Sequence, residues 1–258
     1  MGKCKEIVLR VIPSNIANPF VAAHHYSGTF VRNSQLHFGA FLDGALHGVL
    51  SFGPSMDKRK VIGLVRDTPW DGFVELNRMA FDEVLPRNSE SYCIGRALRE
   101  IKKQAPHIKW VISFADGCSC GDGTIYRASN FVLTGIKENA TIYETPWGEH
   151  ISEISLRVFW SCPESANIAR RLGVPVKRRT IQEWRTLGLK PVPGFMLRYI
   201  YFLDPSFREK LTVPIIPFRD IDKFGAGMAK GAKVTRAERH TECEAQKQKE
   251  EQKDTPPQ

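Results

Sequence analysis

The 258-residue chain is 42% hydrophobic and 25% charged, and its formal net charge is +9. It contains no apolar run of about eighteen residues, so we expect no membrane-spanning helix. Its first residues lack the apolar segment of a secretory signal, and we therefore expect its six cysteines to be free thiols in a reducing compartment.

The positive charge is concentrated in one part of the chain. Residues 157–210 hold eleven Lys/Arg and four Asp/Glu, a net charge of +7, whereas residues 226–258 hold seven and six, a net charge of +1. A cationic segment of this kind is typical of a protein that binds a polyanion, with nucleic acid first. An ordinary solvated basic surface is the alternative. Residues 226–258 also lack large apolar side chains, so we expect a disordered polar tail there.

Hydrophobic patterning predicts a mixed α/β domain over residues 1–225. In chain order we expect strand 6–12, helix 18–26, strands 36–42, 45–52 and 73–81, helix 88–104, strand 111–115, helix 124–130, a strand from 131, helices 165–172 and 180–187, and strand 196–203. Residues 152–160 fit either a strand or a helix. A mixed central sheet with helices on both faces, and a basic helical lobe inserted at about residues 157–195, accounts for this order.

Local signals support several of these elements. Asn18 and Pro19 suit the cap and first turn of a helix, because Asn accepts hydrogen bonds from helix N–H groups and Pro tolerates the first turn. The Asp43-Gly44 pair between two apolar runs is a strong signal for a β-hairpin. Asn88 and Ser89 are candidate caps for the helix that follows them.

The stretch from Val111 to Gly135 carries the clearest signal for an active site. Asp116 comes at the end of an apolar strand and before a Gly-rich turn, and polar side chains at such strand ends face ligand crevices. Tyr126 follows on a short helix, and Ser113 shares the strand of Asp116. We expect these three residues at the site, with Asp116 accepting a proton or a hydrogen bond. An Asx turn for Asp116 and a core position for Tyr126 are the alternatives.

Two further groups of polar residues are candidates for the site. His24, His25 and Tyr26 end the first expected helix, and a histidine there can be a general base or a metal ligand. The alternative is that the helix dipole alone favours histidine at this end. Of the three residues, we single out His25 and Tyr26. Asn77 and Arg78 lie in an expected strand, where alternation directs one of them toward the crevice.

The order of elements resembles the GNAT acyltransferase family, and two motifs carry the resemblance. Residues 90–95, ESYCIG, are similar to the loop whose N–H groups hold the pyrophosphate of coenzyme A at a helix N-terminus. Tyr126 precedes Phe131 by five residues, as does that family's tyrosine that protonates the departing thiolate. The resemblance implies that the cofactor is bound by Ser89, Ser91, Gly95 and Arg96. Cys93 and Glu90 depart from the family pattern, and a carboxylate repels a pyrophosphate.

A closer resemblance, from about residue 7 to about residue 220, is to the phage Mom family. The motifs HHYSG, LSFGPSM, LNRMAF and NSESYCIGRALREIKK and the stretch that starts at Val111 carry it. The resemblance implies an enzyme of the host bacterial cytoplasm that converts adenine in double-stranded phage DNA to N6-carbamoylmethyladenine and so blocks host restriction endonucleases. Asn77 could then pair with adenine through its donor and acceptor.

The basic lobe is expected to hold the DNA backbone, because Lys and Arg side chains neutralise phosphates without reading sequence. The residues we expect at this surface are Arg170, Arg171, Lys177, Arg178, Arg179, Trp184 and Arg185.

The donor of the transferred group stays open. Acetyl-coenzyme A and another acyl or glycine-derived donor are both compatible with the residues, and so is a bound redox metal such as iron that activates the donor. Cys118 and Cys120 lack the usual spacing of a zinc pair. Two other functions compete: a GNAT N-acetyltransferase that uses acetyl-coenzyme A on a protein or small amine, and a non-catalytic DNA-binding protein. The departures at Glu90 and Cys93 count against the first, and the polar groups at one sheet end count against the second. The oligomeric state is also open.

Overall fold

The computed structural model describes residues 3–157, 163–229, 232–235 and 238, in two compact units. Unit 1 comprises Met1–Ala115, Gly123–Gly135 and Leu197–Ile221, and unit 2 comprises Asp116–Asp122, Ile136–Met196 and Asp222–Gln258. Most of the expected polar tail lies outside the described residues. No helix in the described part of the chain is both long enough and apolar enough to cross a membrane.

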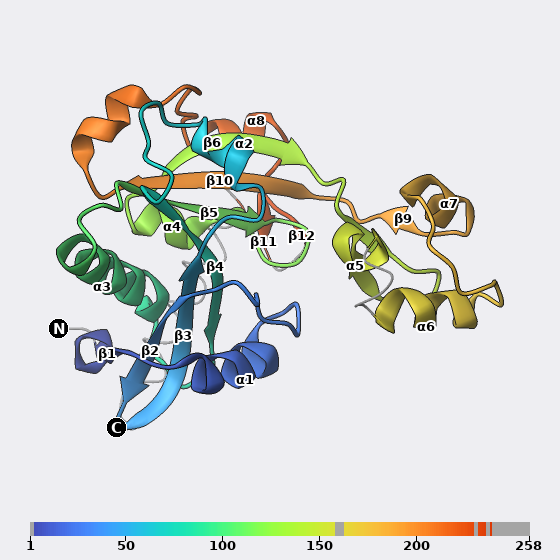
Figure 1. The fold of residues 1–258 in the computed structure, drawn as a ribbon, viewed down its shortest axis with the longest axis horizontal. Helices are drawn as coiled ribbons and strands as arrows, with labels where there is room; N and C mark the ends of the chain where they lie inside the picture. Colours follow the sequence, from blue (N-terminus) through green and yellow to red (C-terminus); the bar gives the residue numbers. More distant parts are fainter. Residues whose placement is uncertain (1–2, 158–162, 230–231, 236–237, 239–258) are drawn as a thin grey trace, which may run out of the picture. The chain divides into compact units, whose positions relative to one another are not determined.

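A seven-stranded mixed sheet is the main element of the fold (Figure 1). Its strands are β1 (Val8–Val11), β2 (Leu36–Leu42), β3 (Ala45–Gly53), β4 (Phe73–Phe81), β5 (Trp110–Asp116), β6 (Val132–Glu138) and β10 (Phe195–Phe202), in the order β1-β2-β3-β4-β5-β10-β6. The first four strands pair antiparallel, and β5 joins β4 in parallel. The expected mixed sheet flanked by helices is therefore confirmed.

The hairpin between β2 and β3 follows from its turn residues. Asp43 and Gly44 have φ values of 50° and 83°, as a two-residue turn of this hairpin type requires. The flanking residues Leu42 and Ala45 are paired, which confirms the predicted hairpin.

Unit 1 includes four α-helices, of which the first packs on the sheet through small and branched side chains. The four helices are α1 (Ser14–His24), α2 (Lys58–Ile62), α3 (Ser89–Gln104) and α4 (Thr124–Ala128). Ala17 and Val21 of α1 are fully buried against Val49 of β3 and Ala80 of β4. This packing fixes the end of α1 over one face of the sheet.

Three local predictions for unit 1 were wrong. The first helix begins at Ser14, where the carbonyl of Pro13 accepts hydrogen bonds from Ile16 and Ala17, so Asn18 is not its cap and Pro19 lies inside it. The burial of Ala17 and Val21 outweighs the preference of proline for the first turn. Asn88 precedes α3 but makes no capping hydrogen bond from its side chain. No helix was expected between the strands 45–52 and 73–81, where the short helix α2 lies.

Unit 2 has its own small sheet and core (Figure 1). Its described elements include strands β7 (Ile142–Glu144), β8 (His150–Ser152) and β9 (Lys190–Pro191), in the order β8-β7-β9, and helices α5 (Glu153–Arg157), α6 (Pro163–Arg171) and α7 (Ile181–Thr186). The ambiguous stretch 152–160 is the end of a strand followed by a helix, and its last three residues lie outside the described ones. Thr180 and Glu183 form a reciprocal capping box, which explains where α7 begins.

Two glycines with the same backbone angle allow a matched test of the packing around α4. Gly44 and Gly123 both have φ of 83°, but only at Gly123 would an added Cβ collide, at 2.5 Å from the ring of Tyr199. Gly44→Ala should lower the free energy of unfolding by about 1–2 kcal/mol, the cost of a left-handed L-residue. Gly123→Ala should cost about 1–3 kcal/mol more, because of the collision. Urea unfolding measures both, and equal losses would contradict this packing.

Candidate active site

The parallel pairing of β4 and β5 stops early, and we call the point at the centre of the sheet where these strands stop pairing the opening. Phe73, Val74 and Glu75 pair with Trp110, Val111 and Ile112, but no pairing follows although both strands continue. The next carbonyl of β4, that of Leu76, accepts a hydrogen bond from the hydroxyl of Ser113 at 3.2 Å instead. The β3–β4 register also shifts here, which leaves Asn77 as an extra residue in β4.

Tyr126 and Ser113, two of the expected site residues, meet at this opening in unit 1. Ser113 Oγ lies 2.9 Å from Tyr126 Oη, and both side chains are buried. The Tyr126 ring is held by Phe131 and Tyr199, with ring centroids 5.4 and 5.2 Å away. Ser113 has one hydroxyl hydrogen, so it can donate to Leu76 or to Tyr126 but not to both at once. The hydroxyl hydrogen of Ser113 can therefore point either to the carbonyl of Leu76 or to the hydroxyl of Tyr126.

The turn after α1 brings His25 to Arg78. The Nδ1 atom of His25 lies 2.7 Å from Ser27 Oγ, and the backbone N–H of Ser27 donates to the same nitrogen at 3.1 Å. Arg78 Nε donates to the carbonyl of Thr29 at 3.2 Å. Burial, and then the charge of Arg78, lower the pKa of His25 to about 4.

The neighbours of His25 differ in exposure. Tyr26, whose ring lies 4.2 Å from that of His25, is 53% exposed and can contact a large substrate. His24 instead stacks on Phe20 of its own helix at 4.3 Å, so its ring is packed along α1.

Asn77 is buried, and its side-chain oxygen accepts a hydrogen bond from Ser34 at 3.0 Å. Beside it lies Glu75, a residue that sequence reasoning missed. Burial raises the pKa of Glu75, while hydrogen bonds from Ser55 and Asn77 and the charge of Arg78 oppose this shift. The signal that could have revealed Glu75 is a lone carboxylate in the otherwise apolar start of β4.

Asp116 belongs to unit 2 and is described with its neighbours there. It is 6% exposed, and its carboxylate accepts a hydrogen bond from the backbone N–H of Cys118 at 2.9 Å, the Asx-turn geometry weighed above. Burial, and then Asp116, raise the pKa of Cys118 to about 12 and that of Cys120 to about 11. Both thiols are therefore protonated at neutral pH.

The four residues expected to bind a cofactor lie in the first turns of α3. The hydroxyls of Ser89 and Ser91 donate back to the carbonyls of Pro86 and Asn88, so they do not project outward. An added Cβ at Gly95 would meet only the tip of Arg99, at 3.9 Å, so packing does not require glycine there. Arg96 is exposed.

The basic lobe of unit 2 has both core and surface members. Trp184 is 1% exposed and belongs to the apolar core, and Arg179 is buried over its ring at 5.1 Å. These two side chains therefore stabilise the lobe and cannot reach phosphates. The other expected cations are exposed: Arg170, Arg171, Lys177, Arg178 and Arg185.

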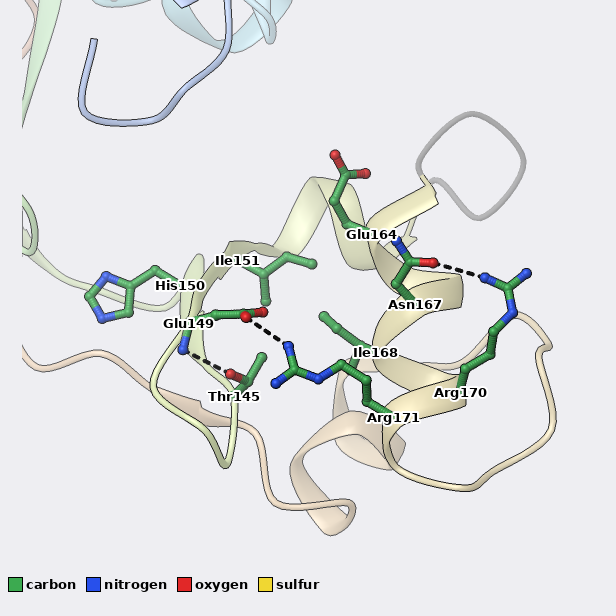
Figure 2. A pocket seen from close by; sticks show the side chains of 9 residues that line it. All are labelled: Thr145, Glu149, His150, Ile151, Glu164, Asn167, Ile168, Arg170 and Arg171. Atoms are coloured by element: carbon green, nitrogen blue, oxygen red, sulfur yellow. Dashed lines mark hydrogen bonds and ion pairs between the residues drawn. The ribbon is translucent and has the colours of Figure 1, made fainter. Parts of the chain in front are cut away.

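A pocket of about 580 Å³ lies between α6 and the β7–β8 hairpin (Figure 2). Ile151 and Ile168 provide its apolar lining. Arg171 donates to Glu149 at 2.7 Å and lies 3.9 Å over the ring of Trp147, so its guanidinium is held in place. Arg170 in turn donates to the side chain of Asn167 at 2.8 Å.

The fold and the opening define an α/β protein with a polar, ionisable site at the centre of a mixed sheet. A model of the Mom protein family matches residues 6–220, and the chain belongs to this family. It is 40% identical over 219 residues to the methylcarbamoylase Mom of Escherichia phage Mu, and the aligned residues cover 85% of each chain.

Solved structures with a similar fold include acetyltransferases. The spermidine/spermine N-acetyltransferase SpeG of Vibrio cholerae is 8% identical, with a TM-score of 0.43 over 80% of this chain and 98% of that one. The IAA acetyltransferase of Bacillus cereus is 12% identical, with a TM-score of 0.41 over 76% and 99%.

The raised pKa of Glu75 predicts a pH-dependent effect on stability. A carboxyl with a raised folded pKa favours folding in its neutral form, so this contribution is lost as the pH rises through that pKa. Glu75→Gln, which cannot ionise, should therefore raise the melting temperature relative to wild type more at pH 8 than at pH 5. Differential scanning fluorimetry measures this, with Glu100→Gln on the exposed face of α3 as the control. A difference in melting temperature between Glu75→Gln and wild type that is equal at both pH values would contradict the burial of an ionisable Glu75.

Proposed function

We propose that this protein transfers a carbamoylmethyl group to N6 of adenine in double-stranded phage DNA, and that the modified base protects the DNA from host restriction endonucleases. The observation that carries the proposal is the 40% identity to a methylcarbamoylase over 219 residues. The reaction would take place in the host cytoplasm, where phage DNA is accessible.

The chemistry explains why the site needs several polar groups. The lone pair of the adenine amine is delocalised into the ring, so the amine must be oriented and must lose a proton as it reacts. In a duplex the amine is also paired, which requires that the base be everted. We assign to Asp116 the acceptance of the proton that the amine loses as its bond to the methylene carbon forms. Tyr126 with Ser113 gives a proton to the group that leaves this carbon as its bond to the donor molecule breaks. Asn77 and Arg78, beside the opening of the sheet, position the base.

The donor of the group is proposed to bind through an anionic part at the start of α3. Asn88 makes no side-chain cap, and the space at Gly95 leaves room beside the first turns of this 16-residue helix. A helix N-terminus attracts anions through its backbone N–H groups. Glu90, in the first turn, opposes an anion, so the fit to a pyrophosphate is incomplete and we derive no step from coenzyme A.

Iron fits the described residues less well. No group of three or more His, Cys, Asp or Glu side chains is placed to hold a metal within the ranges that the structure describes. We therefore derive no step from iron.

The exposed cations of unit 2 are proposed to hold the DNA backbone. Lys177, Arg178 and Arg185 lie on the loop before α7 and on α7 itself, and Arg170 lies at the end of α6. Their positive charge can neutralise several phosphates and release counterions. Contacts of this kind fix the position of the duplex rather than its sequence.

Expression in bacteria tests the function directly. Genomic DNA digested to nucleosides should contain N6-carbamoylmethyl-deoxyadenosine by mass spectrometry. Asp116→Asn keeps the shape and the acceptor for Cys118 but removes the base, and should lower the modified fraction at least about a hundredfold. Asp57→Asn, an exposed carboxylate paired with Lys60, is the control. Unmodified DNA from folded wild-type protein contradicts the function, and full modification by Asp116→Asn removes Asp116 from the mechanism.

Charge reversal tests the DNA-binding surface. The double variant Arg178→Glu, Arg185→Glu should weaken binding to duplex DNA. The negative slope of log K against log salt should become shallower by about 2, because each lost phosphate contact contributes about 0.9 to its magnitude. Fluorescence anisotropy at several salt concentrations measures this slope. Lys102→Glu with Lys103→Glu, on exposed positions of α3, makes the same charge change in unit 1. Equal slopes for the two double variants would contradict the assignment of the surface to unit 2.

A further inference from the structure

The turn after α1 determines which nitrogen of His25 carries a hydrogen. The backbone N–H of Ser27 donates to Nδ1 of His25 at 3.1 Å. A backbone N–H can only donate, so Nδ1 must be an acceptor and carry no hydrogen. The neutral imidazole then carries its hydrogen on Nε2, which becomes a donor.

Protonation of His25 would break this arrangement. The charged ring has a hydrogen on each nitrogen, so its Nδ1–H would face the N–H of Ser27. Burial and the positive charge of Arg78 on β4 act in the same direction, and together they lower the pKa of His25 to about 4. His25 is therefore neutral at physiological pH, and its only basic lone pair is occupied.

The same turn also holds Arg78. The hydroxyl of Ser27 lies 3.3 Å from both the carbonyl oxygen and the hydroxyl of Thr29, and Arg78 Nε donates to that carbonyl at 3.2 Å. The turn bends at Gly28, whose φ of 62° suits glycine. Ser27 thus belongs to one hydrogen-bond network that orients the imidazole and the guanidinium together.

We propose that Ser27 is a positioning residue that fixes His25 in the Nε2–H tautomer, so that His25 donates a hydrogen bond to a ring nitrogen of the everted adenine and does not act as a base. This inference rests on the proposed function and specifies how that site binds its substrate. Adenine has acceptors only at its ring nitrogens, since its amine is the reacting group, so a neutral donor can hold the base without competing for the amine.

Nuclear magnetic resonance tests the tautomer independently of activity. Two-bond ¹H–¹⁵N spectra of histidine-labelled full-length protein, assigned with His25→Gln, should show a neutral Nε2–H ring for His25 from pH 6 to pH 8. Ser27→Ala keeps the backbone N–H and should keep this tautomer, whereas Ser27→Pro, which has no backbone N–H, should introduce the other tautomer or raise the pKa of His25. An Nδ1–H ring, or a titration of His25 between pH 6 and pH 7, would overturn the proposal.

Substitutions of His25 test its role in the reaction. Gln places an N–H donor near the position of Nε2 but offers no base, whereas Asn reaches only the position of Nδ1. In the bacterial expression assay, His25→Gln should keep at least about a third of the modified adenine, while His25→Asn and His25→Ala should lose more than about tenfold, the effect of one lost hydrogen bond. A His25→Gln variant as inactive as His25→Ala would overturn the donor role. If the wild type modifies no adenine, the proposed function fails, while the spectra still decide the tautomer.

Discussion

The early end of pairing between β4 and β5 is the constraint on which the rest of the site depends. Parallel strands that stay paired would use the carbonyl of Leu76 in the ladder. Because they separate after Glu75 and Ile112, Leu76 is satisfied by Ser113, and Ser113 meets Tyr126. At the opening, a backbone carbonyl of β4, that of Leu76, is therefore the hydrogen-bond partner of the expected site residue Ser113.

The groups around this opening share an electrostatic property: burial disfavours their charged forms. It lowers the pKa of His25 and Arg78 and raises that of Glu75. A site of this kind suits a neutral aromatic ligand such as an everted adenine, because a base brings no charge of its own into the sheet. The exposed positive charge that we propose to hold the DNA backbone is instead carried by unit 2.

Much of the fold could be predicted from the sequence, but the contacts of the site could not. Alternation and the Asp43-Gly44 turn predicted the sheet and its hairpin, since both depend on residues close in the chain. The separation of β4 from β5 is tertiary, so Glu75 appeared only as one carboxylate in a strand. Counting charges located the basic lobe but could not reveal that Arg179 and Trp184 are buried together. The bond between Ser27 and His25 depends on the bend at Gly28, which composition does not determine.

The central claim is that the opening in the sheet receives an adenine turned out of the duplex. The most direct measurement is the fluorescence of 2-aminopurine placed at the adenine positions of duplex oligonucleotides, because its emission rises when the base leaves the stack. The account predicts a rise on binding the wild-type protein and a smaller rise with Arg78→Met, which removes the guanidinium beside the opening. Binding proven by anisotropy without any rise in emission would contradict it.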